Sequence, residues 1–173
     1  MDKPFFIKMF DYNFWTHHKV WDCVLRLTDE QFQRPLDYSV GSIQNQCVHV
    51  LATEMMWFNV FMTGIAAVPQ LGVSPPRRAI QACWDDVEDQ VQVYLRTLDQ
   101  AELEREVKPH FWEDSRPAIR VCDAMMQVLN HSTDHRAQIL AGLHSLGVQT
   151  VEQDLLNYLF AKKRQNHSAP MPV

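Results

Sequence analysis

The sequence predicts an all-α protein, a four-helix bundle with at least one long crossover connection. Four long segments place apolar residues three and four positions apart, which is the spacing of one face of an α-helix. Five glycines and nine prolines in 173 residues are too few for the many tight turns of an all-β domain. The connections between the segments, roughly 12 to 18 residues, are long for simple antiparallel hairpins and therefore indicate a crossover.

Each predicted element follows from its local pattern. We expect the four long helices at residues 5–27, 42–63, 77–98 and 118–146. Ser42 is a favourable N-cap for the second helix, and Gly147 suits the position just after the end of the fourth. A short turn begins at Thr28 and is closed by Pro35. The apolar arc of the second helix is wide, which indicates burial against more than one neighbour.

The connections and the C-terminal segment complete a single domain, which we place at residues 1–164. Residues 66–76 contain three prolines and a glycine and are expected to form a loop. Residues 100–117 have a mixed pattern, because two prolines prevent a continuous helix. A shorter amphipathic helix is expected at 152–163, and the tail 165–173 is expected to be disordered.

Composition and charge exclude several classes of protein. The chain has 16 Lys+Arg and 21 Asp+Glu, a formal net charge of −5, with the 46% apolar content of an ordinary globular domain. A general nucleic-acid binder needs a basic face, and the basic run at 162–164 is better explained as a helix C-terminus. No signal-peptide pattern is present, and no segment has the roughly 18 apolar residues of a membrane span. We therefore expect a cytoplasmic protein with neither nucleic acid nor membrane as a partner.

The cysteines do not point to a disulfide framework or a redox motif. They are spread along the chain without a C-x-x-C pair, at Cys23, Cys47, Cys83 and Cys122. Each lies among apolar neighbours in a helical pattern, which is typical of reduced, buried thiols. No histidine lies in an obvious partner motif for a catalytic cysteine, and the role of the four thiols stays open.

Eight histidines are an excess in a chain of this length. His131 and His135 are four residues apart in the fourth predicted helix, so their side chains project from one face and can converge on one metal ion. Two stacked imidazoles on an inward-facing stripe are costly unless something accepts or donates at their nitrogens. The alternative is a pair of hydrogen-bonded core histidines, and the spacing alone does not decide between the two.

The second predicted helix offers further candidates. His49 lies at the edge of its apolar arc and could supply a third imidazole, or could be a satisfied core histidine. Glu54 lies near the middle of the same apolar face, where a carboxylate without a partner is improbable. It could accept a hydrogen bond from an imidazole, act as an extra ligand, or pair with an arginine such as Arg136. His17, on the inward face of the first helix, could approach the same cavity, whereas His18 is expected to be solvated.

Four stretches together resemble the DinB/YfiT-like superfamily of metal-binding four-helix bundles. They are residues 10–15, residues 40–43 with the following His49, Glu54 and Trp57, residues 130–139, and residues 147–158. The resemblance implies a four-helix bundle in which His49, His131 and His135 bind one divalent metal ion per chain, with water completing the coordination. It also implies homodimers, and some relatives are thiol-dependent S-transferases or isomerases.

The resemblance leads to a hypothesis about function. Imidazole ligands suit zinc or nickel best, and iron or manganese are alternatives. The hypothesis is a metal-dependent enzyme of the thiol S-transferase or hydrolase type, with a low-molecular-weight thiol as a partner and an unknown substrate. The catalytic residues are unknown, with Glu54 and Asp134 as candidates for proton transfer, while His17, Glu54 and Arg136 are expected to support the ligands. The alternative is a non-catalytic metal-binding protein induced by damage or stress.

The homodimer expectation has one sequence observation behind it. Tyr12 and Trp15 lie off the inward stripe of the first predicted helix and need to be covered. A partner subunit or another segment of the same chain could cover them, and the sequence does not choose between the two.

Overall fold

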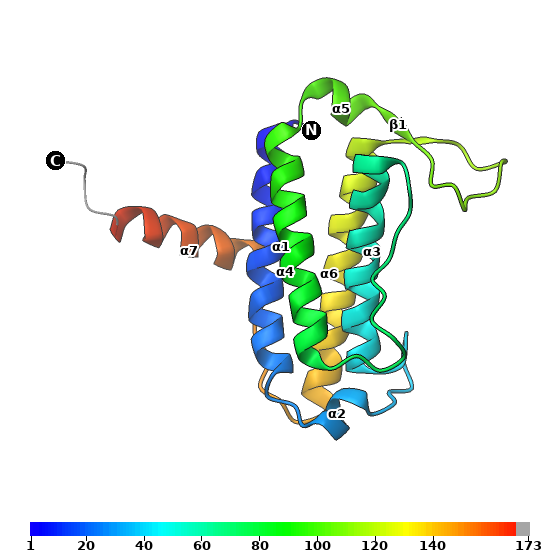
Figure 1. Cartoon of the computed structure of the whole chain (residues 1–173). Helices are drawn as coiled ribbons and strands as arrows, with labels where there is room; N and C mark the ends of the chain where they lie inside the picture. The colour runs from blue at the N-terminus through cyan, green and yellow to red at the C-terminus, as the bar shows by residue number, and fades with distance from the viewer. Residues whose placement is uncertain (169–173) are drawn as a thin grey trace.

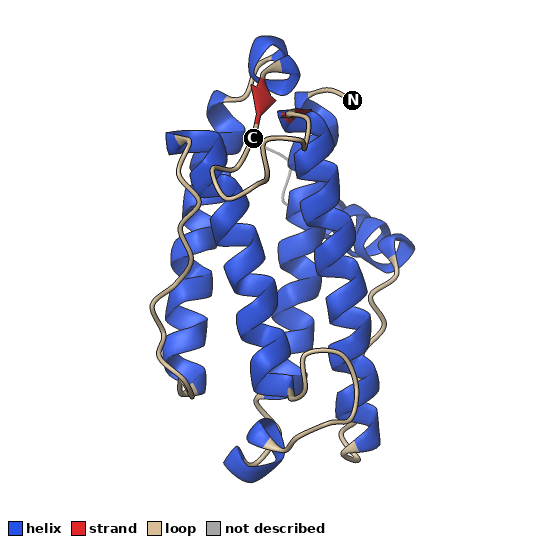
Figure 2. Ribbon diagram, turned by 90° about the vertical axis from the view of Figure 1, so that its right-hand side faces the viewer, coloured by secondary structure: helices blue, strands red, loops and turns tan. Residues whose placement is uncertain are grey.

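The computed structural model describes residues 1–168 and confirms the all-α fold class (Figure 1). Its elements are α1 (Lys3–Val24), α2 (Asp29–Gln33), α3 (Ile43–Thr63), α4 (Arg77–Thr97), α5 (Gln100–Glu104), β1 (Glu106–Val107), β2 (Ile119–Arg120), α6 (Val121–Ser145) and α7 (Leu155–Ser168). The four long helices α1, α3, α4 and α6 lie side by side, as both ribbon views show (Figures 1 and 2).

The predicted crossover is the connection between α3 and α4. The loop after Gly64 runs back along the length of the bundle, so that α4 starts at the same end as α3 and runs parallel to it (Figure 1). Helix α6 packs against both α1 and α3, and α4 also packs against both. The metal-site histidines predicted on the second and fourth long helices therefore lie on neighbouring elements.

The helix ends follow the capping chemistry that the sequence predicts. The Ser42 side chain accepts a hydrogen bond from the backbone N–H of Asn45 at 3.0 Å, and α3 ends at Gly64 with a φ of 76°. Gly147 has a φ of 78°, which favours glycine at the turn after α6. Thr28 forms a capping box with Gln31 and so starts α2.

Helices α3 and α6 approach closely near the start of α3. A Cβ atom placed on Gly142 of α6 would lie 2.7 Å from Cδ1 of Ile43 and 3.0 Å from Cδ1 of Leu36. The missing side chain at Gly142 thus lets the two helices pack closely about two turns from His135.

The region 100–117 has no continuous helix, as its two prolines predict. It contains the short helix α5, and β1 at its centre pairs antiparallel with β2, matching Glu106 with Arg120 and Val107 with Ile119. The pairing occupies residues 119–120, so α6 begins at Val121 rather than at the predicted residue 118.

Helix α7 is longer than predicted and covers an aromatic pair on α1. It continues to Ser168, because no proline interrupts it there; residues 165–168 are therefore helical and not a disordered tail. The remainder of the predicted tail, residues 169–173, lies outside the described residues. Tyr158 of α7 is buried, and its ring packs on those of Tyr12 and Trp15 at centroid distances of 5.7 Å. A segment of the same chain thus covers this pair.

Within the described part of the chain, no helix is both long and apolar enough to cross a membrane. All four cysteines are free, and burial raises the pKa of the Cys47 thiol to about 12, which makes it a poor nucleophile.

Candidate metal centre

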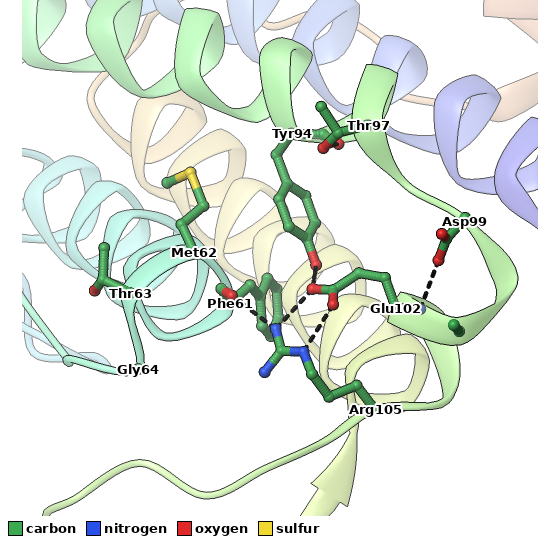
Figure 3. A pocket seen from close by; sticks show the side chains of 10 residues that line it. Phe61, Met62, Thr63, Gly64, Tyr94, Thr97, Asp99, Glu102 and Arg105 are labelled. Carbon is green, nitrogen blue, oxygen red and sulfur yellow. Dashed lines mark hydrogen bonds and ion pairs between the residues drawn. The ribbon is translucent and has the colours of Figure 1, made fainter.

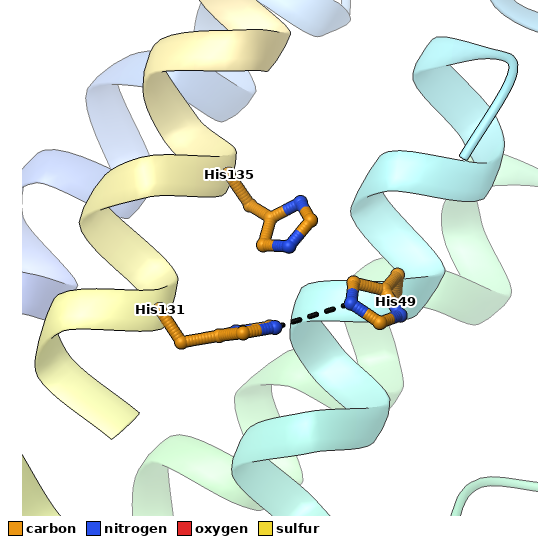
Figure 4. A group of neighbouring side chains, drawn as sticks. All are labelled: His49, His131 and His135. Carbon is orange, nitrogen blue, oxygen red and sulfur yellow. Dashed lines mark hydrogen bonds between the residues drawn. The ribbon is translucent and has the colours of Figure 1, made fainter. Parts of the chain in front are cut away.

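Three imidazoles meet between α3 and α6. His49 comes from α3, and His131 and His135 come from successive turns of α6 (Figure 4). One ring nitrogen from each lies within 4.8 Å of the others, and the Nε2 atoms of His49 and His131 are 3.1 Å apart. In a tetrahedral zinc site with Zn–N bonds of about 2.0–2.1 Å, the nitrogens are about 3.3–3.4 Å apart. The donor set and its spacing therefore fit a divalent metal ion, and we refer to these three residues as the histidine triad.

The surroundings keep the histidine triad neutral. Burial, together with the smaller effects of the neighbouring His135 and His49, lowers the pKa of His131 to about 4. Burial also lowers the pKa of His49 and of His135. A neutral imidazole keeps the lone pair that a metal requires, whereas an imidazolium has none. The triad is thus set to donate electron pairs near neutral pH.

The outer nitrogens of the two α6 imidazoles differ in their partners. Nδ1 of His135 lies 2.8 Å from Oε1 of Gln46, a buried side chain on α3. Nδ1 of His131 is buried and has no hydrogen-bond partner among the described residues. Of these two rings, only that of His135 therefore has a hydrogen-bond partner on the side facing away from the triad.

Glu54 is fully buried but does not contact the histidine triad. Its Oε1 accepts hydrogen bonds from Nδ2 of Asn13 at 2.9 Å and from Oγ of Ser132 at 2.5 Å. Burial raises its pKa, and these two hydrogen bonds oppose the shift. The expectations that Glu54 is an extra metal ligand or an acceptor for an imidazole are therefore not met.

Arg136 is the buried cation that balances Glu54, but the two do not touch. Arg136 is 2% exposed, and its guanidinium donates to Oδ1 of Asn13, the same residue whose amide donates to Glu54. Burial lowers the pKa of Arg136, and the charge of Glu54 opposes this. Asn13 therefore bridges a buried acid and a buried base, a role that the sequence analysis did not assign to it.

The two remaining predicted site residues lie outside the triad. Asp134 is exposed and accepts a hydrogen bond from Nε2 of Gln138 at 3.1 Å. His17 stacks on the indole of Trp84 at a centroid distance of 3.8 Å, and burial lowers its pKa to about 3. His18 is more than half exposed and pairs with Glu88, close to the solvated state expected for it.

Comparison with known proteins decides the family. The family model described as "DinB family" matches residues 1–167 of this chain. The chain belongs to the DinB family. Protein DinB of Bacillus subtilis (strain 168) is 24% identical to it over 167 residues, covering 93% of this chain and 97% of that protein.

Solved structures of DinB-like proteins share the fold. A DinB-like protein of Bacillus cereus ATCC 10987 aligns with a TM-score of 0.65 at 15% identity, over 85% of this chain and 94% of that one. The DinB-like protein YjoA of Bacillus subtilis gives a TM-score of 0.62 at 11% identity, over 83% of this chain and 95% of that one. At these identities the likeness supports the bundle architecture and no more.

A pocket of about 380 Å³ in this DinB-family chain has His49 in its wall. The rest of the wall is uncharged and comes from the end of the α2–α3 connection, from α3 and from the crossover loop: Val40, Asn45, Val48, Ala52, Gly72, Val73 and Pro75. A second pocket, of about 290 Å³, has Gln46 and Gln138 in its wall. Both pockets therefore adjoin side chains of the triad or of its hydrogen-bond partners.

A larger pocket of this DinB-family chain, of about 910 Å³, lies away from the triad. It lies between the C-terminal ends of α3 and α4 and the helix α5 (Figure 3). Its polar groups are paired with one another: the Tyr94 hydroxyl donates to Glu102 at 2.5 Å, and Arg105 donates to the same carboxylate at 2.6 and 2.7 Å. It contains none of the triad residues.

Two glutamines beside the triad were not predicted from the sequence. Gln46 precedes His49 by three residues and Gln138 follows His135 by three, so each lies about one helical turn from a triad member. That spacing is a signal in the sequence that could have identified them as neighbours of the triad. Their mutual hydrogen bond at 3.0 Å joins α3 to α6, which is visible only once the two helices are packed.

Proposed function

We propose that this DinB-family protein binds one divalent metal ion per chain through the histidine triad and is a metal-dependent enzyme of the thiol-transfer or hydrolysis class. The observation that carries the proposal is the convergence of three neutral imidazoles from two packed helices within 4.8 Å. An all-imidazole donor set favours zinc or nickel, with iron and manganese as alternatives.

The chain's own residues suit such a reaction. An ion held by three histidines with a position left open activates a bound water or thiol as a nucleophile at neutral pH. His49 and His131 are partly exposed, while His135 is buried, so the triad is open toward solvent on one side. The pocket beside His49 is small, which favours a low-molecular-weight thiol and a small second substrate.

Elemental analysis tests the metal site. We expect about one metal ion per chain in the reconstituted protein and its loss in His131→Ala, because two imidazoles bind far more weakly than three. The matched control is His18→Ala, which removes an exposed imidazole bonded to Glu88 and should keep the metal. Substoichiometric metal in the wild-type protein, or full metal in His131→Ala, would disprove the site.

Turnover tests the reaction class. The metal-loaded and chelated proteins are incubated with small thiols and an electrophile, and separately with ester and amide substrates. Metal-dependent consumption of thiol or substrate supports an enzyme. If chelation lowers the melting temperature but no substrate turns over, the protein is a non-catalytic metal-binding protein instead.

A further inference from the structure

A line of hydrogen bonds connects an exposed carboxylate to a buried member of the histidine triad. Nε2 of Gln138 donates to Oδ2 of Asp134 at 3.1 Å, and Nε2 of Gln46 donates to Oε1 of Gln138 at 3.0 Å. Oε1 of Gln46 then lies 2.8 Å from Nδ1 of His135. We call Asp134, Gln138 and Gln46 the hydrogen-bond relay; it starts on α6, crosses to α3 and returns to α6.

Asp134 sets the direction of every bond in the relay. A carboxylate only accepts hydrogen bonds, so Gln138 must turn its NH₂ group toward Asp134 and its carbonyl oxygen toward Gln46. Gln46 must then donate its own NH₂ group to that oxygen, which leaves its carbonyl oxygen facing His135. Turning either amide over by itself would place two donors or two acceptors against each other.

The end of the relay determines where His135 carries its proton. A carbonyl oxygen also only accepts, so Nδ1 of His135 is the protonated nitrogen and Nε2 keeps the lone pair. Nε2 is the nitrogen on the other side of the ring from Gln46. Among the described residues, the buried Nδ1 of His131 has no such partner, so the relay acts on His135 alone of the two α6 ligands.

We infer that Asp134, Gln138 and Gln46 are positioning residues that hold His135 in its Nδ1–H tautomer and direct its Nε2 lone pair into the triad. The inference rests on the proposed metal site. Hydrogen bonds to the outer nitrogen of a metal-binding histidine contribute about 10- to 100-fold in metal affinity. The relay also explains why two glutamine side chains, one of them 3% exposed, lie beside the triad.

A double-mutant cycle tests the relay with Zn²⁺ alone as the probe, in competition with a chromogenic chelator. Asp134→Asn keeps the shape of an exposed side chain but also offers a donor, so the direction of the relay is lost; we expect Zn²⁺ affinity to fall about 10-fold or more. In a Gln138→Leu background no side-chain amide connects Asp134 to Gln46, so Asp134 no longer sets the orientation of Gln46. Adding Asp134→Asn there should change the affinity less than about twofold.

The control and the opposing result are both measurable. Asp123→Asn removes the same charge from an exposed position of α6 outside the relay and should leave Zn²⁺ affinity unchanged. If Asp134 acts only through its charge, Asp134→Asn will weaken binding equally in both backgrounds, and the inference is overturned. Should Gln138→Leu not fold, Gln138→Ala replaces it as the background, because it also interrupts the relay and should make Asp134→Asn silent.

Nitrogen-15 NMR of the histidine rings gives a readout that needs no metal. In the metal-free wild-type protein we expect His135 as the Nδ1–H tautomer, and in Asp134→Asn a mixture of both tautomers. An Nε2–H tautomer in the wild-type protein overturns the inference. If His135 is found as Nδ1–H but Zn²⁺ does not bind, the control of the tautomer is supported and the proposed metal site is overturned.

Discussion

At the scale of single residues, the interior of this bundle contains a buried acid and a buried base. Glu54 and Arg136 are both buried and are connected through Asn13 rather than by direct contact. A buried charge is tolerated only when it is hydrogen-bonded and balanced by another. The polar side chains behind the histidine triad are therefore a joint arrangement, in which each group depends on the others.

Replacing one member of this arrangement should be costly. We expect Glu54→Leu to lower the free energy of unfolding by about 3–5 kcal/mol, because it leaves Arg136 buried without a countercharge. Urea denaturation measures the change. The double variant Glu54→Leu with Arg136→Met should recover part of the loss; if it is less stable than Glu54→Leu alone, the two charges do not balance each other.

His17 predicts a pH dependence of stability. Its pKa is lowered to about 3 in the folded protein and is 6.5 in a model peptide, so protons bind preferentially to the unfolded chain. The stabilising contribution is complete above pH 6.5 and is lost progressively as the pH falls from 6.5 toward 3. In metal-free protein, His17→Phe should keep the stacking on Trp84 and bind up to one proton fewer on unfolding in this range. Equal pH slopes of the unfolding free energy in both proteins would contradict this.

At the scale of elements, the distance between α3 and α6 determines whether the three imidazoles of the triad can meet. His49 lies on one helix and the other two imidazoles on its neighbour, and the helices come close where Gly142 faces Ile43. The i, i+4 spacing on α6 is a property of any helix. The third imidazole is brought in by helix packing.

Filling this contact should therefore weaken the metal site as well as the fold. Gly142→Leu would force Ile43 and the start of α3 away from α6, and we expect a loss of about 1–3 kcal/mol in unfolding free energy. Metal affinity should fall with it. The control is Ala137→Leu, at an exposed position of the same helix, which should change neither quantity. If Gly142→Leu is destabilised but binds the metal with normal affinity, the packing at Gly142 does not control the metal site.

At the scale of the whole molecule, a bound metal would link the two halves of the bundle. A metal ion that binds only the folded protein would raise the free energy of unfolding by about 2.7 kcal/mol when its concentration is 100 times its Kd. For a domain of this size, that is about 5–11 °C in melting temperature. We expect calorimetry to show this difference in melting temperature between metal-loaded and chelated protein. A difference of less than 2 °C would indicate that the site does not bind the metal tightly.

Homodimer formation stays a prediction, which light scattering can measure.

The sequence by itself determined the four long helices and the shared face of His131 and His135. Apolar periodicity and capping residues act locally, and two histidines four residues apart share a face in any helix. It also identified Glu54 as a buried carboxylate that must have a partner, but not which partner. These features depend on residues close together in the sequence, so they can be predicted without any tertiary contact.

Only the tertiary structure decided which side chains meet. Glu54 accepts hydrogen bonds from Asn13 and Ser132 and none from the triad, and the ring of His17 stacks on Trp84. Nδ1 of His135 lies within hydrogen-bonding distance of Gln46, which is 89 residues away in the sequence and on another helix. Hydrogen bonds and ring contacts act over a few ångströms, so they depend on the register and rotation of packed helices, which a one-dimensional pattern does not contain.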